Sequence, residues 1–130
     1  MIGASDGGAH ILSFSTYGDT GYLFSRFVRD QGTLSLEAAI KKITMDTADI
    51  WAIPERGQLK PGFVADVTIF DAEVIDRGPE YYVQDVPGDG HRYVRDSVGV
   101  ETVIIGGAVA YTRETGYTGE NRGEIIGGQA

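Results

Sequence analysis

A change of residue pattern near Pro54 constrains the fold of this chain more than any other feature of its sequence. Before Pro54, apolar residues recur at the three- and four-residue intervals that are typical of amphipathic helices. After Pro54, short runs of β-branched residues are separated by glycines, as in strands that are joined by turns. The sequence therefore predicts two regions, residues 1–53 and 54–130, of which the first is mostly helical and the second mostly β-strand.

Three helices are predicted in the first region. The first covers residues 19–31, with Asp19 as its N-cap. The second begins at Ser35, whose hydroxyl oxygen can accept a hydrogen bond from the first helical turn. The third covers residues 45–52, and its Trp51 is expected in the core between the two regions.

The second region is predicted to hold a few short strands. Residues 64–70 form a strand after a Pro-Gly turn, and residues 101–105 and 108–111 form a hairpin around Gly106-Gly107. Residues 76–99 are expected to be a loop with a weak strand at 91–94, because prolines and glycines interrupt them. So few strands make a poor sheet alone, and partner strands from outside the sequence are expected.

Length and composition exclude several classes of function. A chain of 130 residues can bury one core but is too short for a large enzyme fold. Its net charge of −8 argues against nucleic acid and membrane surfaces as partners, because both attract clustered lysine and arginine. The absence of cysteine excludes disulfides, thiolate metal sites and a cysteine nucleophile within this sequence. Since no apolar run approaches about 18 residues and no secretion leader is present, a cytoplasmic location is expected.

The first ten residues, MIGASDGGAH, combine a short apolar run with an acidic residue and two glycines. This order is typical of a strand that ends by placing Asp6 at a surface, with Gly7 and Gly8 in a tight loop. An ordinary turn with a capping aspartate fits these residues as well, because Asp and Gly dominate turns for local reasons.

Three segments together resemble the C-terminal part of the amidohydrolase superfamily, and within it the D-aminoacylase or N-acyl-D-amino-acid deacylase branch. They are GASDGGAH, ITMDTADIWAI and RGQLKPGFVADVTIFD, at residues 3–10, 43–53 and 56–71. The resemblance implies an α/β fold, the C-terminal piece of a (β/α)8 metal-dependent hydrolase barrel. Residues 1–53 would hold the last barrel strand, the active-site loop and the following helices, and residues 54–130 part of a small β-sandwich domain.

The same resemblance implies a zinc-dependent hydrolase that cleaves the amide C–N bond of a small molecule, an N-acyl (D-)amino acid. Asp6 would be its catalytic base and would also contact the metal, while His10 would contact the substrate. The other metal ligands of the family, including a His-x-His pair, lie on earlier strands and do not occur in this sequence, so the isolated chain is expected to be inactive. His91 is expected to be a surface or strand residue, and Asp66 to make a structural hydrogen bond.

Alternatives remain open at the level of substrate and activity. D-aminoacylases carry an arginine after the catalytic aspartate, suited to a substrate carboxylate, but residues 7–18 contain neither arginine nor lysine. A cyclic-amide hydrolase of the hydantoinase or dihydroorotase type is therefore an alternative, as is a catalytically inert binding or assembly module. Strand edges that lack partners in this sequence favour a homo-oligomer.

Overall fold

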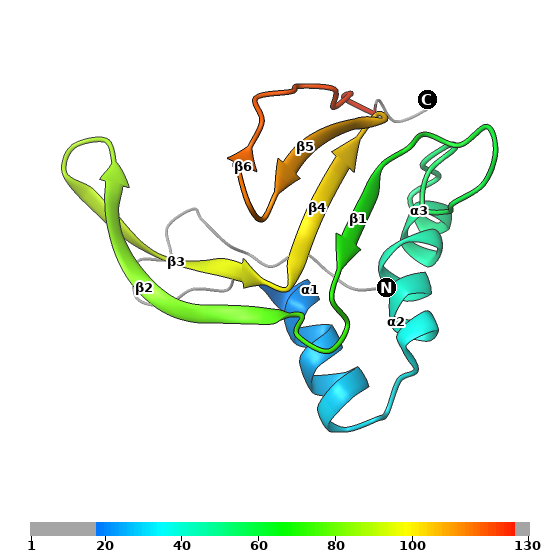
Figure 1. Cartoon of the computed structure of the whole chain (residues 1–130), viewed down its shortest axis with the longest axis horizontal. Helices are drawn as coiled ribbons and strands as arrows, with labels where there is room; N and C mark the ends of the chain where they lie inside the picture. Colours follow the sequence, from blue (N-terminus) through cyan, green and yellow to red (C-terminus); the bar gives the residue numbers. More distant parts are fainter. Residues whose placement is uncertain (1–17, 127–130) are drawn as a thin grey trace. The chain divides into compact units, whose positions relative to one another are not determined.

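The computed structural model describes residues 18–126, which divide into two compact units (Figure 1). We call residues 35–71 and 100–126 the sheet unit, and residues 18–34 and 72–99 the ribbon unit. Each unit combines helices from the first part of the chain with strands from the second. The domain boundary predicted at residue 53 refers to the domains of a longer protein and not to these two units. This boundary stays a prediction.

The sheet unit contains a four-stranded antiparallel sheet in the order β1-β4-β5-β6 (Figure 1). Its strands are β1 (Val67–Phe70), β4 (Val100–Ile105), β5 (Ala108–Thr112) and β6 (Gly116–Tyr117). Gly106 and Gly107 connect β4 to β5 with φ angles of 55° and 81°, which glycine adopts without strain. The predicted hairpin at Gly106-Gly107 is confirmed.

A second predicted turn of the sheet unit is also confirmed. The amide of Phe63 donates a hydrogen bond to the carbonyl oxygen of Lys60 at 3.0 Å, and Gly62 has a φ of 90°. Proline at the second position and a glycine with positive φ at the third define a type II turn. The strand that follows begins at Val67, three residues later than the predicted residue 64.

The helices of the sheet unit are α2 (Leu36–Ile43) and α3 (Met45–Ile50). Ser35 caps α2 as predicted, because its hydroxyl accepts a hydrogen bond from the amide of Ala38 at 3.2 Å. The prediction that Trp51 lies in the core is wrong, since this residue is 65% exposed. Helix α3 ends one residue before Trp51 and buries the small side chain of Ala48 instead. No helix within residues 18–126 has the length and apolar character of a membrane span.

The helical part of the ribbon unit consists of α1 (Asp19–Tyr22) and the π-helix η1 (Leu23–Asp30), which continues it. Gly18, not Asp19, occupies the N-cap position. Leu23 and Phe24 are buried. The predicted helix at residues 19–31 is thus present, although most of it is π-helical.

The strands of the ribbon unit are β2 (Asp76–Val86) and β3 (Gly90–Val98), which form a long antiparallel hairpin (Figure 1). The prediction of a loop over residues 76–99 is therefore wrong, although the weak strand predicted at 91–94 lies within β3. Pro79 lies in β2 where the register shifts between Arg77 and Glu80. Proline has no amide hydrogen, and at this bulge its absence does not interrupt the regular pairing of β2 with β3. Pro87 lies in the turn between the strands, where proline is tolerated.

Candidate active site

The predicted catalytic and substrate-binding residues, Asp6 and His10, lie outside the described residues. The description begins at Gly18, twelve positions after Asp6 in the sequence. The structure therefore shows how the segment that follows the predicted active-site loop is held, and which other polar groups could act chemically.

Helix α1 lies directly against the backbone of β2. A Cβ atom at Gly21 would lie 2.6 Å from the carbonyl oxygen of Asp76, closer than Cβ atoms occur in proteins. A Cβ atom at Gly18 would lie 2.6 Å from the Cβ of Arg77, and Gly18 also has a φ of 90°. The absence of side chains at Gly18 and Gly21 therefore permits the contact between the helix and the strand.

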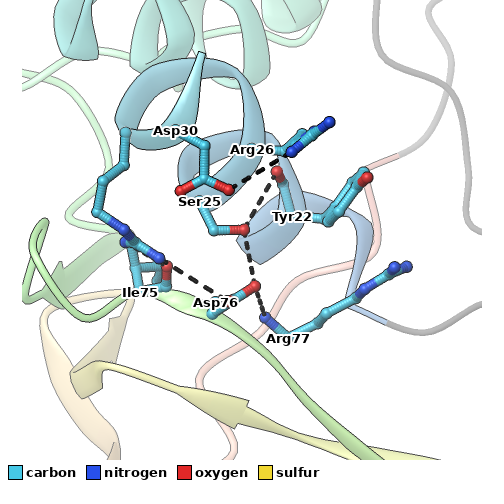
Figure 2. A network of polar contacts seen from close by, with 8 residues as sticks. Tyr22, Ser25, Arg26, Asp30, Ile75, Asp76 and Arg77 are labelled. Carbon is cyan, nitrogen blue, oxygen red and sulfur yellow. Dashed lines mark hydrogen bonds and ion pairs between the residues drawn. The ribbon is translucent and has the colours of Figure 1, made fainter. Parts of the chain in front are cut away.

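A polar network joins the helix to the start of β2 (Figure 2). The hydroxyl of Ser25 and the amide of Arg77 each donate a hydrogen bond to Oδ1 of Asp76 at 2.7 Å. Arg29 donates from Nη1 to the carbonyl oxygen of Ile75 at 3.0 Å, and its Nη2 lies 3.8 Å from Oδ2 of Asp76. We call Ser25, Arg29 and Asp76 the helix anchor.

The helix anchor holds the segment that leaves the predicted active-site loop. Ser25 is only 4% exposed, so its hydroxyl needs the partner that Asp76 provides. The guanidinium of Arg77 lies 4.1 Å from the ring centre of Tyr22 and adds a cation–π contact beside the anchor (Figure 2). These groups fix the helix against β2.

Two anchor residues lie on the π-helix η1, a conformation that is rare and is often found next to functional sites. The amide of Gln31 donates to the carbonyl oxygen of Arg26, five residues earlier, at 3.0 Å. Sequence reasoning did not detect the anchor. Ser25 and its partner Asp76 are 51 positions apart, and no local pattern links residues at that separation.

Asp66 makes a structural contact, as predicted. Its Oδ1 accepts a hydrogen bond from the amide of Gly106 at 2.8 Å, and its Oδ2 accepts one from Nε of Arg56 at 3.1 Å. Arg56 also lies 3.3 Å from a carboxylate oxygen of Glu124. The two ends of the segment RGQLKPGFVAD thus meet each other and the hairpin turn between β4 and β5.

The described residues do not fit a resident metal ion. Between residues 18 and 126, no three or more His, Cys, Asp or Glu side chains are grouped so that they could hold one. His91 lies in β3, in agreement with its predicted place on a strand, and its ring centre lies 4.8 Å from that of Tyr82. Any metal that this chain helps to bind must therefore involve residues outside the described part.

Polar side chains of the ribbon unit interact within the hairpin. Arg92 binds both carboxylate oxygens of Asp85, at 2.8 and 2.7 Å, and this pairing lowers the pKa of Asp85. The hydroxyl of Tyr81 donates to Asp96 at 2.9 Å, which raises the pKa of Tyr81. These exposed pairs stabilise the hairpin, and none of them forms a constellation of acid, base and nucleophile.

Known proteins similar to this chain include two deacylases of Alcaligenes xylosoxydans xylosoxydans. The chain is 30% identical to the D-aminoacylase of this organism over 104 residues, and this alignment covers 80% of this chain and 19% of the D-aminoacylase. The chain is 33% identical to the N-acyl-D-glutamate deacylase of the same organism over 90 residues, and this alignment covers 68% of this chain and 16% of the deacylase. The chain thus spans less than a fifth of the length of these curated relatives.

A more distant relative and two solved structures extend the comparison. A dihydroorotase of Lactobacillus johnsonii is 29% identical over 97 residues, which cover 72% of this chain and 22% of that protein. A D-aminoacylase variant in complex with copper chloride matches 85% of this chain, with a TM-score of 0.68 and 28% identity, over 21% of its own length. A D-aminoacylase structure determined to define the role of its binuclear metal centre matches 81% of this chain, with a TM-score of 0.57 and 25% identity, over 20% of its length.

The family assignment follows from a match over most of the sequence. Residues 1–111 match the model of the amidohydrolase family, and the structural matches show an amidohydrolase-like α/β fold. The chain therefore belongs to the amidohydrolase family.

Proposed function

We propose that this chain is the C-terminal part of a metal-dependent hydrolase that cleaves the amide C–N bond of an N-acyl-D-amino acid. The observation that carries the proposal is the similarity to a D-aminoacylase over 80% of the chain. The similarity to an N-acyl-D-glutamate deacylase over 68% of the chain supports the same class of substrate.

In this proposal, residues 1–53 supply the last strand of a (β/α)8 barrel, the active-site loop and the following helices, and residues 54–130 supply part of a β-sandwich domain. The match of residues 1–111 to the model of the amidohydrolase family supports the place of this segment in such an enzyme. Barrel enzymes carry catalytic groups at the C-terminal ends of their strands, which is the place proposed for Asp6.

The proposed role of Asp6 is that of the general base. Its carboxylate takes a proton from the attacking water and passes it to the nitrogen of the leaving amine. A divalent metal, zinc in our proposal, would supply Lewis-acid chemistry that lowers the pKa of that water. Asp6 would also contact this metal, His10 would contact the substrate, and the remaining ligands would come from residues outside this chain.

Of the two alternatives, one has support of its own. The similarity to a dihydroorotase over 72% of the chain favours a cyclic-amide hydrolase, and so does the absence of arginine and lysine from residues 7–18. The second alternative is an inert binding or assembly module. The lack of a metal-binding group among residues 18–126 is compatible with this alternative and with the proposal alike.

A chimaeric enzyme tests the proposal. The matching segment of the Alcaligenes D-aminoacylase is replaced by residues 1–111 of this chain, and turnover of N-acetyl-D-amino acids and of dihydroorotate is measured with zinc. We expect turnover of the N-acyl-D-amino acids, a loss of at least about 100-fold in Asp6→Asn, and no loss in the control Asp19→Asn. Asp19 is a suitable control because it is an exposed residue at the start of α1.

The outcomes separate the alternatives. Turnover of dihydroorotate alone would replace the proposed substrate by a cyclic amide. A folded chimaera that hydrolyses neither substrate would favour the inert module. An Asp6→Asn chimaera as active as its parent would remove the proposed base, whichever substrate is turned over.

A further inference from the structure

The β2–β3 hairpin has two very different outer edges. Both register shifts of the pair place an extra residue on β2, between Arg77 and Glu80 and between Val83 and Val86. Strand β2 also contains Pro79, which has no amide hydrogen. Bulges and proline are two of the features by which an edge strand avoids pairing with another chain. Strand β3 has neither of them.

Among the described residues, the hairpin forms a sheet of only two strands, and no third strand pairs with β3. A two-stranded hairpin needs a helix or further strands for stability in water, and in this unit α1 already packs against β2. The regular edge of β3, over Gly90–Val98, is therefore the place where an additional strand would add most to this unit.

The sequence of β3 is complementary in charge to itself. In an antiparallel pair of β3 strands centred on Val94, Arg92 of each copy faces Asp96 of the other, and all nine residues are paired. No like charges face each other in this register. A shift of one residue that brings Tyr93 opposite Val94 would place Arg92 opposite Arg95, so charge favours the centred register over this neighbour.

The neighbouring strand extends the same charge pattern. Arg92 already binds Asp85 on β2, so the proposed pair would place its guanidinium between two carboxylates, one from each copy. Asp96 accepts a hydrogen bond from the hydroxyl of Tyr81 on β2 and would face Arg92 of the second copy on its other side. The charges would thus alternate across the assembled sheet.

We propose that a second copy of this chain pairs with β3, so that two β2–β3 hairpins form one antiparallel sheet around a twofold axis at Val94. Each copy contributes the same edge to such an isologous interface. The proposal commits to a homodimer and does not depend on the proposed hydrolase activity.

A cysteine at the twofold axis tests the proposed pairing directly. The chain has no cysteine, so Val94→Cys introduces a unique thiol. Facing residues of paired antiparallel strands have Cα atoms roughly 4.5–5.5 Å apart, within the range that a disulfide spans. In the control Ser97→Cys, on the same strand, the two thiols would be six residues apart along the pair, about 20 Å. Mild oxidation should convert most of Val94→Cys into a covalent dimer and leave Ser97→Cys monomeric.

A charge reversal tests the register independently. Asp96→Lys places a positive charge opposite Arg92 of the second copy, and light scattering should report a monomer, whereas the unaltered chain should show twice the mass of 14.0 kDa. Glu114→Lys makes the same change of charge in the sheet unit and should remain a dimer. Tyr81→Phe removes only the hydrogen bond to Asp96 within the chain and should also remain a dimer, which separates loss of pairing from damage to the hairpin.

Several results would overturn the proposal. One is a monomeric unaltered chain at micromolar concentration, as expected if the edge of β3 is instead paired by another segment of a longer protein. Another is equal cross-linking of Val94→Cys and Ser97→Cys, which would exclude the centred register. Dimeric Asp96→Lys with a normal circular dichroism spectrum would place the interface elsewhere.

Discussion

Replacing Gly21 with alanine should destabilise the chain, although the same substitution in an open helix stabilises by about 0.5–1 kcal/mol. A Cβ atom at this position would lie 2.6 Å from the carbonyl oxygen of Asp76 and 2.7 Å from its carbonyl carbon, so α1 must move away from β2. Overpacking of this kind costs about 1–3 kcal/mol, which exceeds the gain in helix propensity. Urea unfolding followed by circular dichroism measures the difference in the free energy of unfolding. An unchanged or higher midpoint would refute the close contact.

A double-mutant cycle tests whether Gly21→Ala lowers the free energy of unfolding by breaking the contacts of the helix anchor. Ser25→Ala removes the 2.7 Å hydrogen bond to Asp76, whose side chain is 41% exposed, so we expect a loss of about 1 kcal/mol after discounting for solvent. If Gly21→Ala already moves the helix away from β2, Ser25→Ala should cause little further loss of stability. The free energy of unfolding of the double variant should then fall by about 1 kcal/mol less than the sum of the two single losses. Additive losses would contradict a shared contact between α1 and β2.

Three further predictions concern activity, acid stability and the RGQLKPGFVAD segment. The purified chain with zinc should not hydrolyse N-acyl amino acids, because the His-x-His ligands are missing from its sequence; turnover that a chelator abolishes would contradict this. Arg92 holds the pKa of Asp85 below its ordinary value, so this pair stabilises the hairpin at pH values above the pKa that Asp85 has in the unfolded chain. The contribution of the pair is lost as the pH falls through the lower pKa that Asp85 has in the folded chain. Asp85→Asn should flatten that acid dependence, and a carboxyl NMR titration that shows an ordinary pKa would exclude the effect. Asp66→Ala should lower the free energy of unfolding by about 1–2 kcal/mol. Asp66→Asn should lower it less, because an amide oxygen can still accept the hydrogen bond from the amide of Gly106. Equal losses of the two variants in urea unfolding would contradict this geometry.

The features that the sequence predicted correctly depend on a few adjacent residues. The cap at Ser35, the Pro-Gly turn at residues 60–63 and the Gly106-Gly107 hairpin each follow from the conformations that one or two side chains permit. The structural role of Asp66 was also predictable, because an aspartate before a strand and after a turn usually accepts backbone hydrogen bonds.

The features that sequence reasoning missed depend on residues far apart in the chain. Prolines and glycines made residues 76–99 look like a loop, but Pro79 sits at a bulge whose existence is decided by the register with β3. The helix anchor joins Ser25 to Asp76 across 51 positions, and no local pattern signals such a pair. Trp51 was expected in the core, but it is exposed, as is Ile50 within α3, because this short helix buries only Ala48.

The central claim, that this chain is the C-terminal part of a metal-dependent amidohydrolase, is tested most directly by the genomic sequence immediately upstream of the codon for Met1. The account predicts an open reading frame that continues upstream without a stop codon and encodes a His-x-His pair on an early strand. An in-frame stop codon directly before Met1, with no such pair encoded upstream, would contradict the account.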